Sequence, residues 1–142
     1  MDRVRDSSVF DGFIADLEKD RPAFLASFGK QFYGVGLLNF SISSDYLAWT
    51  QNLALQASLR SSIACVKAFS TTDFRADMKT FTVPTLVIHG TKDATVPFEV
   101  SGEKAAKLIA GAHLKTYEGA PHGLHHTEQE RLTTDLAAFA RV

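Results

Sequence analysis

The chain has 142 residues, of which 45% are hydrophobic, and its formal net charge is −1. This length is enough to bury one core, and the near-neutral charge offers no basic face for nucleic acid. The single cysteine, Cys65, excludes an internal disulfide and is compatible with a reducing compartment. No apolar run approaches a membrane span, and the N-terminus lacks the apolar core of a signal peptide. We therefore expect a cytoplasmic protein that binds neither nucleic acid nor membranes.

Hydrophobic residues recur at helical spacing in the first half of the chain, beginning with Phe10, Phe13, Ile14 and Leu17. Such spacing predicts a helix with one apolar face. The triplet Asp20-Arg21-Pro22 should end this helix and start another, because proline is well accommodated in a first turn. After a loop at residues 34–44, further helices are predicted at residues 45–57, at residues 59–69 and from a Thr72 cap to Lys79.

The pattern changes to alternating strands and helices in the second half. Residues 85–89 form an apolar run between Pro84 and Gly90, which is typical of a strand covered on both faces. The next predicted elements are a helix at residues 99–109 that stops near Gly111, a strand at residues 114–118, and a last helix with a Thr127/Glu130 capping box and a buried stripe of Leu132, Leu136 and Phe139. This order predicts two parallel strands joined by a crossover helix.

Each predicted strand ends in a loop that carries a residue with catalytic potential. Asp93 follows the first strand, and His122 follows the second within Gly-Ala-Pro-His-Gly. Neighbouring parallel strands end at the same edge of a sheet, so the pair suits a histidine base oriented by a carboxylate. Asp93 could instead accept backbone N–H bonds in its own loop, and His122 could be a structural loop histidine. His89 is expected to hydrogen-bond the turn that follows the first strand.

Three histidines close in sequence raise the question of a metal site: His122, His125 and His126, with Glu128 and Glu130 nearby. Their side chains are of a suitable kind. However, His125 and His126 are adjacent and should point in different directions, and the chain has no H-E-x-x-H motif. We therefore expect no native metal site.

The run V-P-T-L-V-I-H-G-T-K-D-A-T-V-P followed by G-A-P-H-G resembles the α/β-hydrolase superfamily, in its esterase and cofactor-free haloperoxidase branch. The resemblance implies an α/β fold that is the C-terminal portion of an α/β-hydrolase. Residues 8–81 would be the helical cap and residues 82–142 the last βαβα part of the core.

The same resemblance implies functional roles. Asp93 would be the triad acid and His122 the general base, with no metal, haem or other cofactor. A small ester or carboxylic acid would be the substrate of the complete enzyme, because members of this branch hydrolyse esters or form peracids from hydrogen peroxide. Trp49, Phe69 and the phenylalanines of the helical region are most simply core residues, and some could instead line an apolar substrate pocket.

The nucleophile elbow of the family, G-x-S-x-G, has no counterpart in the chain. We therefore expect a partial hydrolase that is inactive alone, with an exposed apolar strand edge at residues 85–89 that seeks a partner. Three explanations compete: a fragment lacking the N-terminal half of a hydrolase, a homo-oligomer that completes its sheet with a second copy, and a non-catalytic oligomerising or binding module derived from a hydrolase. We favour the first, with the second as its physical consequence.

Overall fold

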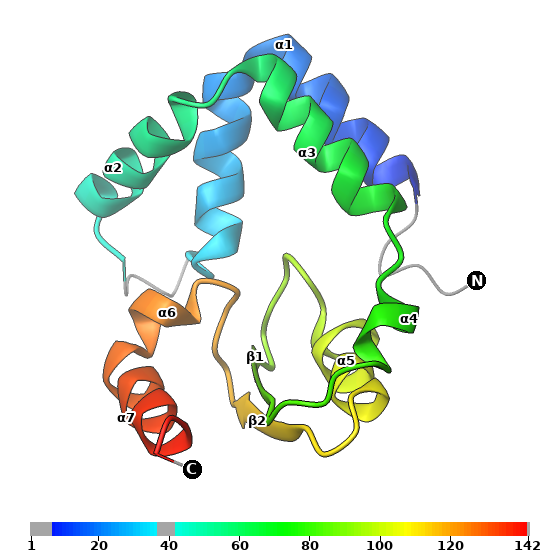
Figure 1. Ribbon diagram of the computed structural model, residues 1–142. Helices are drawn as coiled ribbons and strands as arrows, with labels where there is room; N and C mark the ends of the chain where they lie inside the picture. Colours follow the sequence, from blue (N-terminus) through cyan, green and yellow to red (C-terminus); the bar gives the residue numbers. More distant parts are fainter. Residues whose placement is uncertain (1–6, 37–41, 142) are drawn as a thin grey trace.

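The computed structural model describes residues 7–36 and 42–141, in which a helical segment precedes a segment of alternating strands and helices (Figure 1). The elements in chain order are α1 (Ser7–Phe32), α2 (Ser44–Leu55), α3 (Leu59–Thr71), α4 (Arg75–Met78), β1 (Leu86–Gly90), the 3₁₀ helix η1 (Phe98–Val100), α5 (Gly102–Leu108), β2 (His113–Tyr117), α6 (Leu124–Thr127) and α7 (Gln129–Phe139). None of these helices is long and apolar enough to cross a membrane. Part of the predicted loop, residues 37–41, lies outside the described residues.

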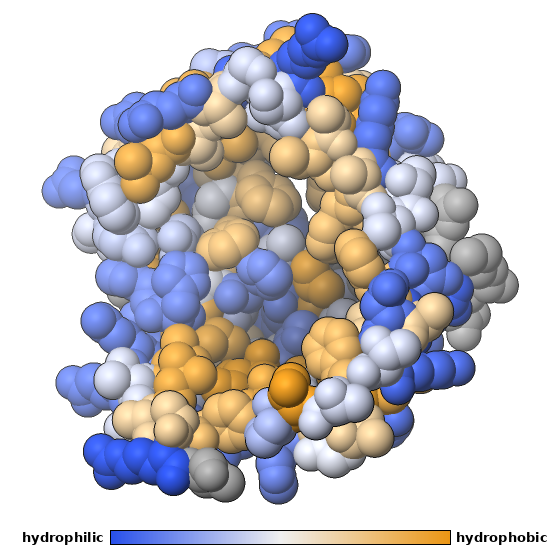
Figure 2. All heavy atoms as spheres, viewed as in Figure 1, coloured by the Kyte–Doolittle hydropathy of each residue, from blue (hydrophilic) through white to orange (hydrophobic). Residues whose placement is uncertain are grey.

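The strands β1 and β2 pair in parallel, as the sequence predicts, from Leu86 opposite His113 to Gly90 opposite Tyr117. The fold is therefore α/β, with helices first and then two parallel strands with flanking helices. Figure 1 shows α1, α2 and α3 together at one end of the molecule, and the strands with α5, α6 and α7 at the other. On the face drawn in Figure 2, the surface is hollowed between these two ends, and apolar side chains gather around the hollow.

The long helix α1 bends at Asp20, whose φ of −155° and ψ of 83° are not helical. The Asp20 carboxylate accepts a hydrogen bond from the Ala23 N–H at 3.0 Å and so caps the second half of the helix. Pro22 lies in the first turn of that half, where its missing N–H is not needed. The predicted break at residues 20–22 is confirmed. The Arg21 guanidinium donates to the Leu55 carbonyl at 2.9 Å, which ties the bend to the end of α2.

A helix contacts the strand pair on each face. On one face, the Asp135 carboxylate of α7 accepts hydrogen bonds from the Lys115 ammonium at 2.5 Å and from the Tyr117 hydroxyl at 2.7 Å. On the other face, His89 of β1 lies against Gly102 at the start of α5, where a Cβ would be 2.4 Å from the imidazole Nδ1. Figure 1 shows α5 and α7 on opposite sides of the strands.

Tyr117 anchors α7 to the sheet. It is fully buried, and the Arg131 guanidinium of α7 lies 3.8 Å from the centre of its ring. Burial, and then the hydrogen bond to the Asp135 carboxylate, raise the pKa of Tyr117 to about 12. The hydrogen bonds from Lys115 and then Tyr117 hold the pKa of Asp135 below its ordinary value. The hydrogen bond therefore stabilises the protonated hydroxyl of Tyr117 and the ionised carboxylate of Asp135.

Two predicted helix caps are wrong. The Thr72 hydroxyl donates to the Ala68 carbonyl at 2.7 Å, because α3 extends to Thr71 and makes Thr72 its C-cap. Thr127 is the last residue of α6, and its hydroxyl has no partner among the described residues. Helix α7 begins at Gln129 without a side-chain cap. The predicted helix at residues 99–109 is divided into η1 and α5 at Ser101, and it ends before Gly111, whose φ is +73°.

The predicted burial is too high at four places. Residues 86–88 of β1 are only half-buried, and Leu136 of α7 is 48% exposed. In the helical segment, Trp49 is 54% and Phe69 is 63% exposed, so neither is a core residue in this chain. The physical reason is the same in each case, because no part of the described chain covers these apolar surfaces.

We expect Tyr117→Phe to lower the free energy of unfolding by about 1 kcal/mol, because it removes the hydroxyl that holds the Asp135 carboxylate. Urea denaturation followed by circular dichroism would measure the change. The control is Lys107→Met, which breaks the exposed Lys107–Glu103 ion pair of α5 and should have a smaller effect. An equal loss in both variants would contradict the anchoring role of Tyr117.

Candidate active site

The structure brings Asp93 and His122 together from the loops that follow β1 and β2. The His122 Nδ1 lies 2.6 Å from the Asp93 Oδ2, although the two residues are 29 positions apart. Their strands are neighbours and parallel, so both loops leave the sheet at the same edge. The Asp93 side chain is 3% exposed and that of His122 is 32% exposed. A buried carboxylate thus faces a histidine that reaches the surface.

Asp93 uses its two carboxylate oxygens differently. The Oδ1 accepts hydrogen bonds from the backbone N–H groups of Thr95 at 2.9 Å and Val96 at 2.7 Å. The Oδ2 faces the imidazole of His122 and also lies 3.1 Å from the Nε2 of His89. One oxygen therefore orders the loop, while the other faces the imidazole of His122.

His122 has its two ring nitrogens in different surroundings. Because the Asp93 carboxylate is an acceptor, the Nδ1 carries the proton and the Nε2 keeps its lone pair. No described residue is hydrogen-bonded to the Nε2. The Phe32 ring packs edge-on against the imidazole with 4.6 Å between ring centroids. Such an imidazole can accept a proton at the Nε2 while the carboxylate stabilises the resulting cation.

The two loops are joined by backbone contacts. At the end of β1, a Cβ on Gly90 would lie 2.2 Å from the Ala120 carbonyl oxygen, so only glycine permits this approach. The same Ala120 carbonyl accepts a hydrogen bond from the Lys92 N–H at 3.0 Å. The Gly119 N–H donates to the Thr91 hydroxyl at 2.8 Å. These contacts hold the loop that carries Asp93 (the acid loop) and the loop that carries His122 (the histidine loop) in one arrangement.

The C-terminal end of α1 contacts both loops, which the sequence analysis did not predict. The Gly123 N–H donates to the Phe32 carbonyl at 2.7 Å, directly after His122. The Gln31 side-chain amide donates to the Ala94 carbonyl at 3.1 Å, directly after Asp93. The helical segment thus supports the pair as well as lying near it. No local sequence signal marks contacts between residues so far apart in the chain.

The other two histidines of the predicted cluster take part in aromatic packing. The His126 ring stacks on Tyr46 with 3.9 Å between centroids, and the His125 ring lies 5.9 Å from Tyr33. Within residues 7–36 and 42–141, no three histidine, cysteine, aspartate or glutamate side chains are grouped so that they could hold a metal ion. The structure therefore does not bring His125 and His126 into the Asp93–His122 site.

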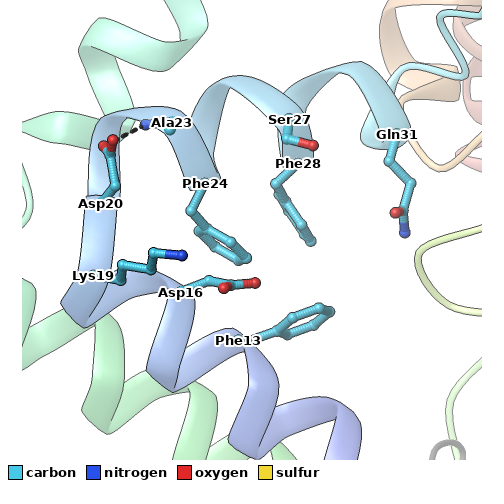
Figure 3. Close-up of a pocket in the computed structure, with 9 residues that line it drawn as sticks. All are labelled: Phe13, Asp16, Lys19, Asp20, Ala23, Phe24, Ser27, Phe28 and Gln31. Carbon is cyan, nitrogen blue, oxygen red and sulfur yellow. Dashed lines mark hydrogen bonds between the residues drawn. The ribbon is translucent and has the colours of Figure 1, made fainter.

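A pocket lies in the bend of α1, with a volume of about 480 Å³. Its lining residues are Phe13, Asp16, Lys19, Asp20, Ala23, Phe24, Ser27, Phe28 and Gln31. Figure 3 shows the rings of Phe13, Phe24 and Phe28 pointing into the angle between the two halves of the helix. The row of rings continues to Phe32, whose ring centroid lies 6.2 Å from that of Phe28 and 4.6 Å from that of His122. An apolar wall therefore leads from the pocket to the imidazole.

No family model matches the sequence. The chain is 40% identical to a non-heme chloroperoxidase from Streptomyces lividans over 136 residues, which are 94% of the chain and 49% of that protein. It is 35% identical to the bifunctional esterase/perhydrolase DCH from Acinetobacter calcoaceticus, of which it also covers 49%. The crystal structure of a bromoperoxidase from Bacillus anthracis superposes with a TM-score of 0.93 at 36% identity, covering 97% of the chain and 50% of that structure.

These similarities confirm the predicted resemblance. The chain is similar to the esterases and non-heme haloperoxidases of the α/β-hydrolase superfamily. It spans about half the length of the curated relatives it matches. Its fold is that of the C-terminal portion of an α/β-hydrolase.

We expect Gly90→Ala to destabilise the protein by at least about 2 kcal/mol, because the new methyl group would overlap the Ala120 carbonyl. The matched control is Gly12→Ala in α1, where a Cβ meets nothing within 4 Å and should stabilise the helix by up to about 1 kcal/mol. Urea denaturation of both variants would measure the difference. A Gly90→Ala variant as stable as Gly12→Ala would contradict the close contact between the two loops.

Proposed function

We propose that this chain supplies the acid and the general base of a Ser-His-Asp triad in a carboxylesterase or perhydrolase, with Asp93 as the acid and His122 as the base. The observation that carries the proposal is the 2.6 Å contact between the His122 Nδ1 and the Asp93 Oδ2, which leaves the Nε2 without a partner among the described residues. In this proposal residues 8–81 form the cap, and residues 82–142 form the C-terminal part of the hydrolase core.

The chemistry follows from the two ring nitrogens of His122. Its Nε2 would take the proton of a serine hydroxyl as the serine attacks an ester carbonyl, and would return it to the leaving alcohol. Asp93 would hold the ring through the Nδ1 and stabilise the imidazolium. The chain has no G-x-S-x-G motif, so the serine and the oxyanion N–H donors would come from a part of the fold outside these 142 residues.

We propose a small ester or carboxylic acid with an apolar group as the substrate. The row of phenylalanine rings that leads from the pocket in α1 to His122 supports an apolar substrate. The names of the relatives support both ester hydrolysis and peracid formation. The two reactions differ in whether water or hydrogen peroxide attacks the acyl-enzyme, and the same triad serves both. The enzymatic relatives favour this proposal over the predicted alternative of a non-catalytic module.

In a longer protein that contains the nucleophile elbow, Asp93→Asn and His122→Ala should each lower kcat/KM for p-nitrophenyl acetate by on the order of 10³-fold or more. His113→Ala, at the exposed start of β2, is the matched control and should leave the activity unchanged. The 142-residue chain alone should show no saturable turnover. Saturable turnover by this chain that disappears in His122→Ala would contradict the proposed division of the triad.

We also propose that the open edge of β1 pairs with another strand. In the described residues β1 pairs only with β2, and its residues 86–88 are only half-buried. For the isolated chain, the expected partner is β1 of a second copy across a two-fold axis, since this arrangement pairs both edges at once. It would further bury Leu86, Val87 and Ile88, each worth roughly 1.5–3 kcal/mol if fully removed from water.

Light scattering of the 142-residue chain at micromolar concentration should therefore give the mass of a dimer. Hydrogen exchange should show slow exchange of the β1 amides in the same sample. A well-folded monomer whose β1 amides exchange quickly would rule this pairing out.

A further inference from the structure

His89 places a second imidazole on the Asp93 carboxylate, and the proposed reaction has no role for it. Its Nε2 lies 2.9 Å from the Val96 carbonyl oxygen and 3.1 Å from the Asp93 Oδ2. A backbone carbonyl can only accept a hydrogen bond, so the Nε2 of His89 carries the proton and donates it. The Asp93 Oδ2 accepts its hydrogen bond from the His122 Nδ1 and has the His89 Nε2 beside it. One carboxylate oxygen therefore faces two imidazoles.

The imidazole of His89 is closely packed by its neighbours. Its side chain is 13% exposed, and the Phe98 ring lies with its centroid 5.6 Å from that of the imidazole. The start of α5 passes so close that a Cβ on Gly102 would lie 2.4 Å from the Nδ1. The imidazole is thus enclosed between β1, η1 and α5, with its Nε2 at the acid loop.

The hydrogen bond of His89 to the Val96 carbonyl holds the acid loop from one side. The Val96 N–H donates to the Asp93 Oδ1, while the Val96 carbonyl accepts from His89. Val96 is therefore held through both its N–H and its carbonyl, and its N–H in turn restricts the rotation of the Asp93 carboxylate. With the Oδ1 held by backbone N–H groups, the Oδ2 is the oxygen that faces both imidazoles.

We propose that His89 is a positioning residue for the Asp93–His122 pair. Its Nε2–H donates to the Val96 carbonyl, and its ring, with the Nε2 3.1 Å from the Asp93 Oδ2, keeps the carboxylate in the geometry that orients His122. This inference rests on the triad role proposed for Asp93 and His122. In this proposal His89 is a third side chain that determines which ring nitrogen of His122 carries the proton.

The test compares His89→Gln, whose amide can still donate from about the position of the Nε2, with His89→Met, which has similar length and no donor. Long-range ¹H–¹⁵N correlations of the 142-residue chain at about pH 9, where an ordinary imidazole is neutral, report which ring nitrogen of His122 carries the proton. We expect the Nδ1–H form in the unsubstituted chain and in His89→Gln. In His89→Met we expect a shift toward the Nε2–H form that a free imidazole prefers.

A second readout is the activity of a longer protein that contains the nucleophile elbow. There, His89→Met should lower kcat by on the order of 10-fold to 100-fold with little change in KM, and His89→Gln should restore most of it. An unchanged His122 tautomer and kcat in His89→Met would overturn the proposal. Equal losses in both variants would also overturn it, since they would indicate a packing role alone.

The two proposals fail in different ways. If Asp93→Asn left the activity of the longer protein intact, the triad role would be wrong. The His122 tautomer in the 142-residue chain would still show whether His89 orients the pair.

Discussion

The short hydrogen bond between the His122 Nδ1 and the Asp93 Oδ2 is the contact on which the account of this protein depends. It exists because two parallel strands end side by side and because Gly90 lets the histidine loop approach the end of β1. The buried Asp93 carboxylate is satisfied by hydrogen bonds on both oxygens. A buried acceptor with all of these donors has one favoured orientation, and this orientation determines which nitrogen of His122 is available for chemistry.

The helical segment takes part in this arrangement through the last turn of α1. The Phe32 carbonyl accepts a hydrogen bond from the loop of His122, and the Gln31 side chain donates one to the loop of Asp93. The Phe32 ring packs on the His122 imidazole. The bend at Asp20 turns the two halves of α1 toward each other, so that their phenylalanines line the pocket (Figure 3). One helix therefore carries both the apolar wall and the support for the Asp93–His122 pair. Changes in the position of α1 and in the geometry of the Asp93–His122 pair should be coupled for this reason.

The sequence predicted those features that depend on local pattern. Strand periods and the turn residues around Asp93 and His122 were enough to place both side chains at one edge of a parallel pair, and the structure brings them together. The burial of Trp49 and Phe69 could not be predicted correctly, because burial depends on what lies opposite a side chain. The contacts of Gln31 and Phe32 join residues distant in sequence and leave no local pattern. The proximity of His89 to the Asp93 Oδ2 was missed for a different reason, since the pattern predicts only that it bonds the turn.

The most direct test of this account is the proton NMR spectrum of the 142-residue chain in the far-downfield region, where a proton in a short imidazole–carboxylate hydrogen bond resonates. We predict one such resonance from the His122 Nδ1–H, and its disappearance in both Asp93→Asn and His122→Ala. A spectrum without this resonance, or a resonance that persists in Asp93→Asn, would contradict the claim that this chain alone assembles the acid–histidine pair.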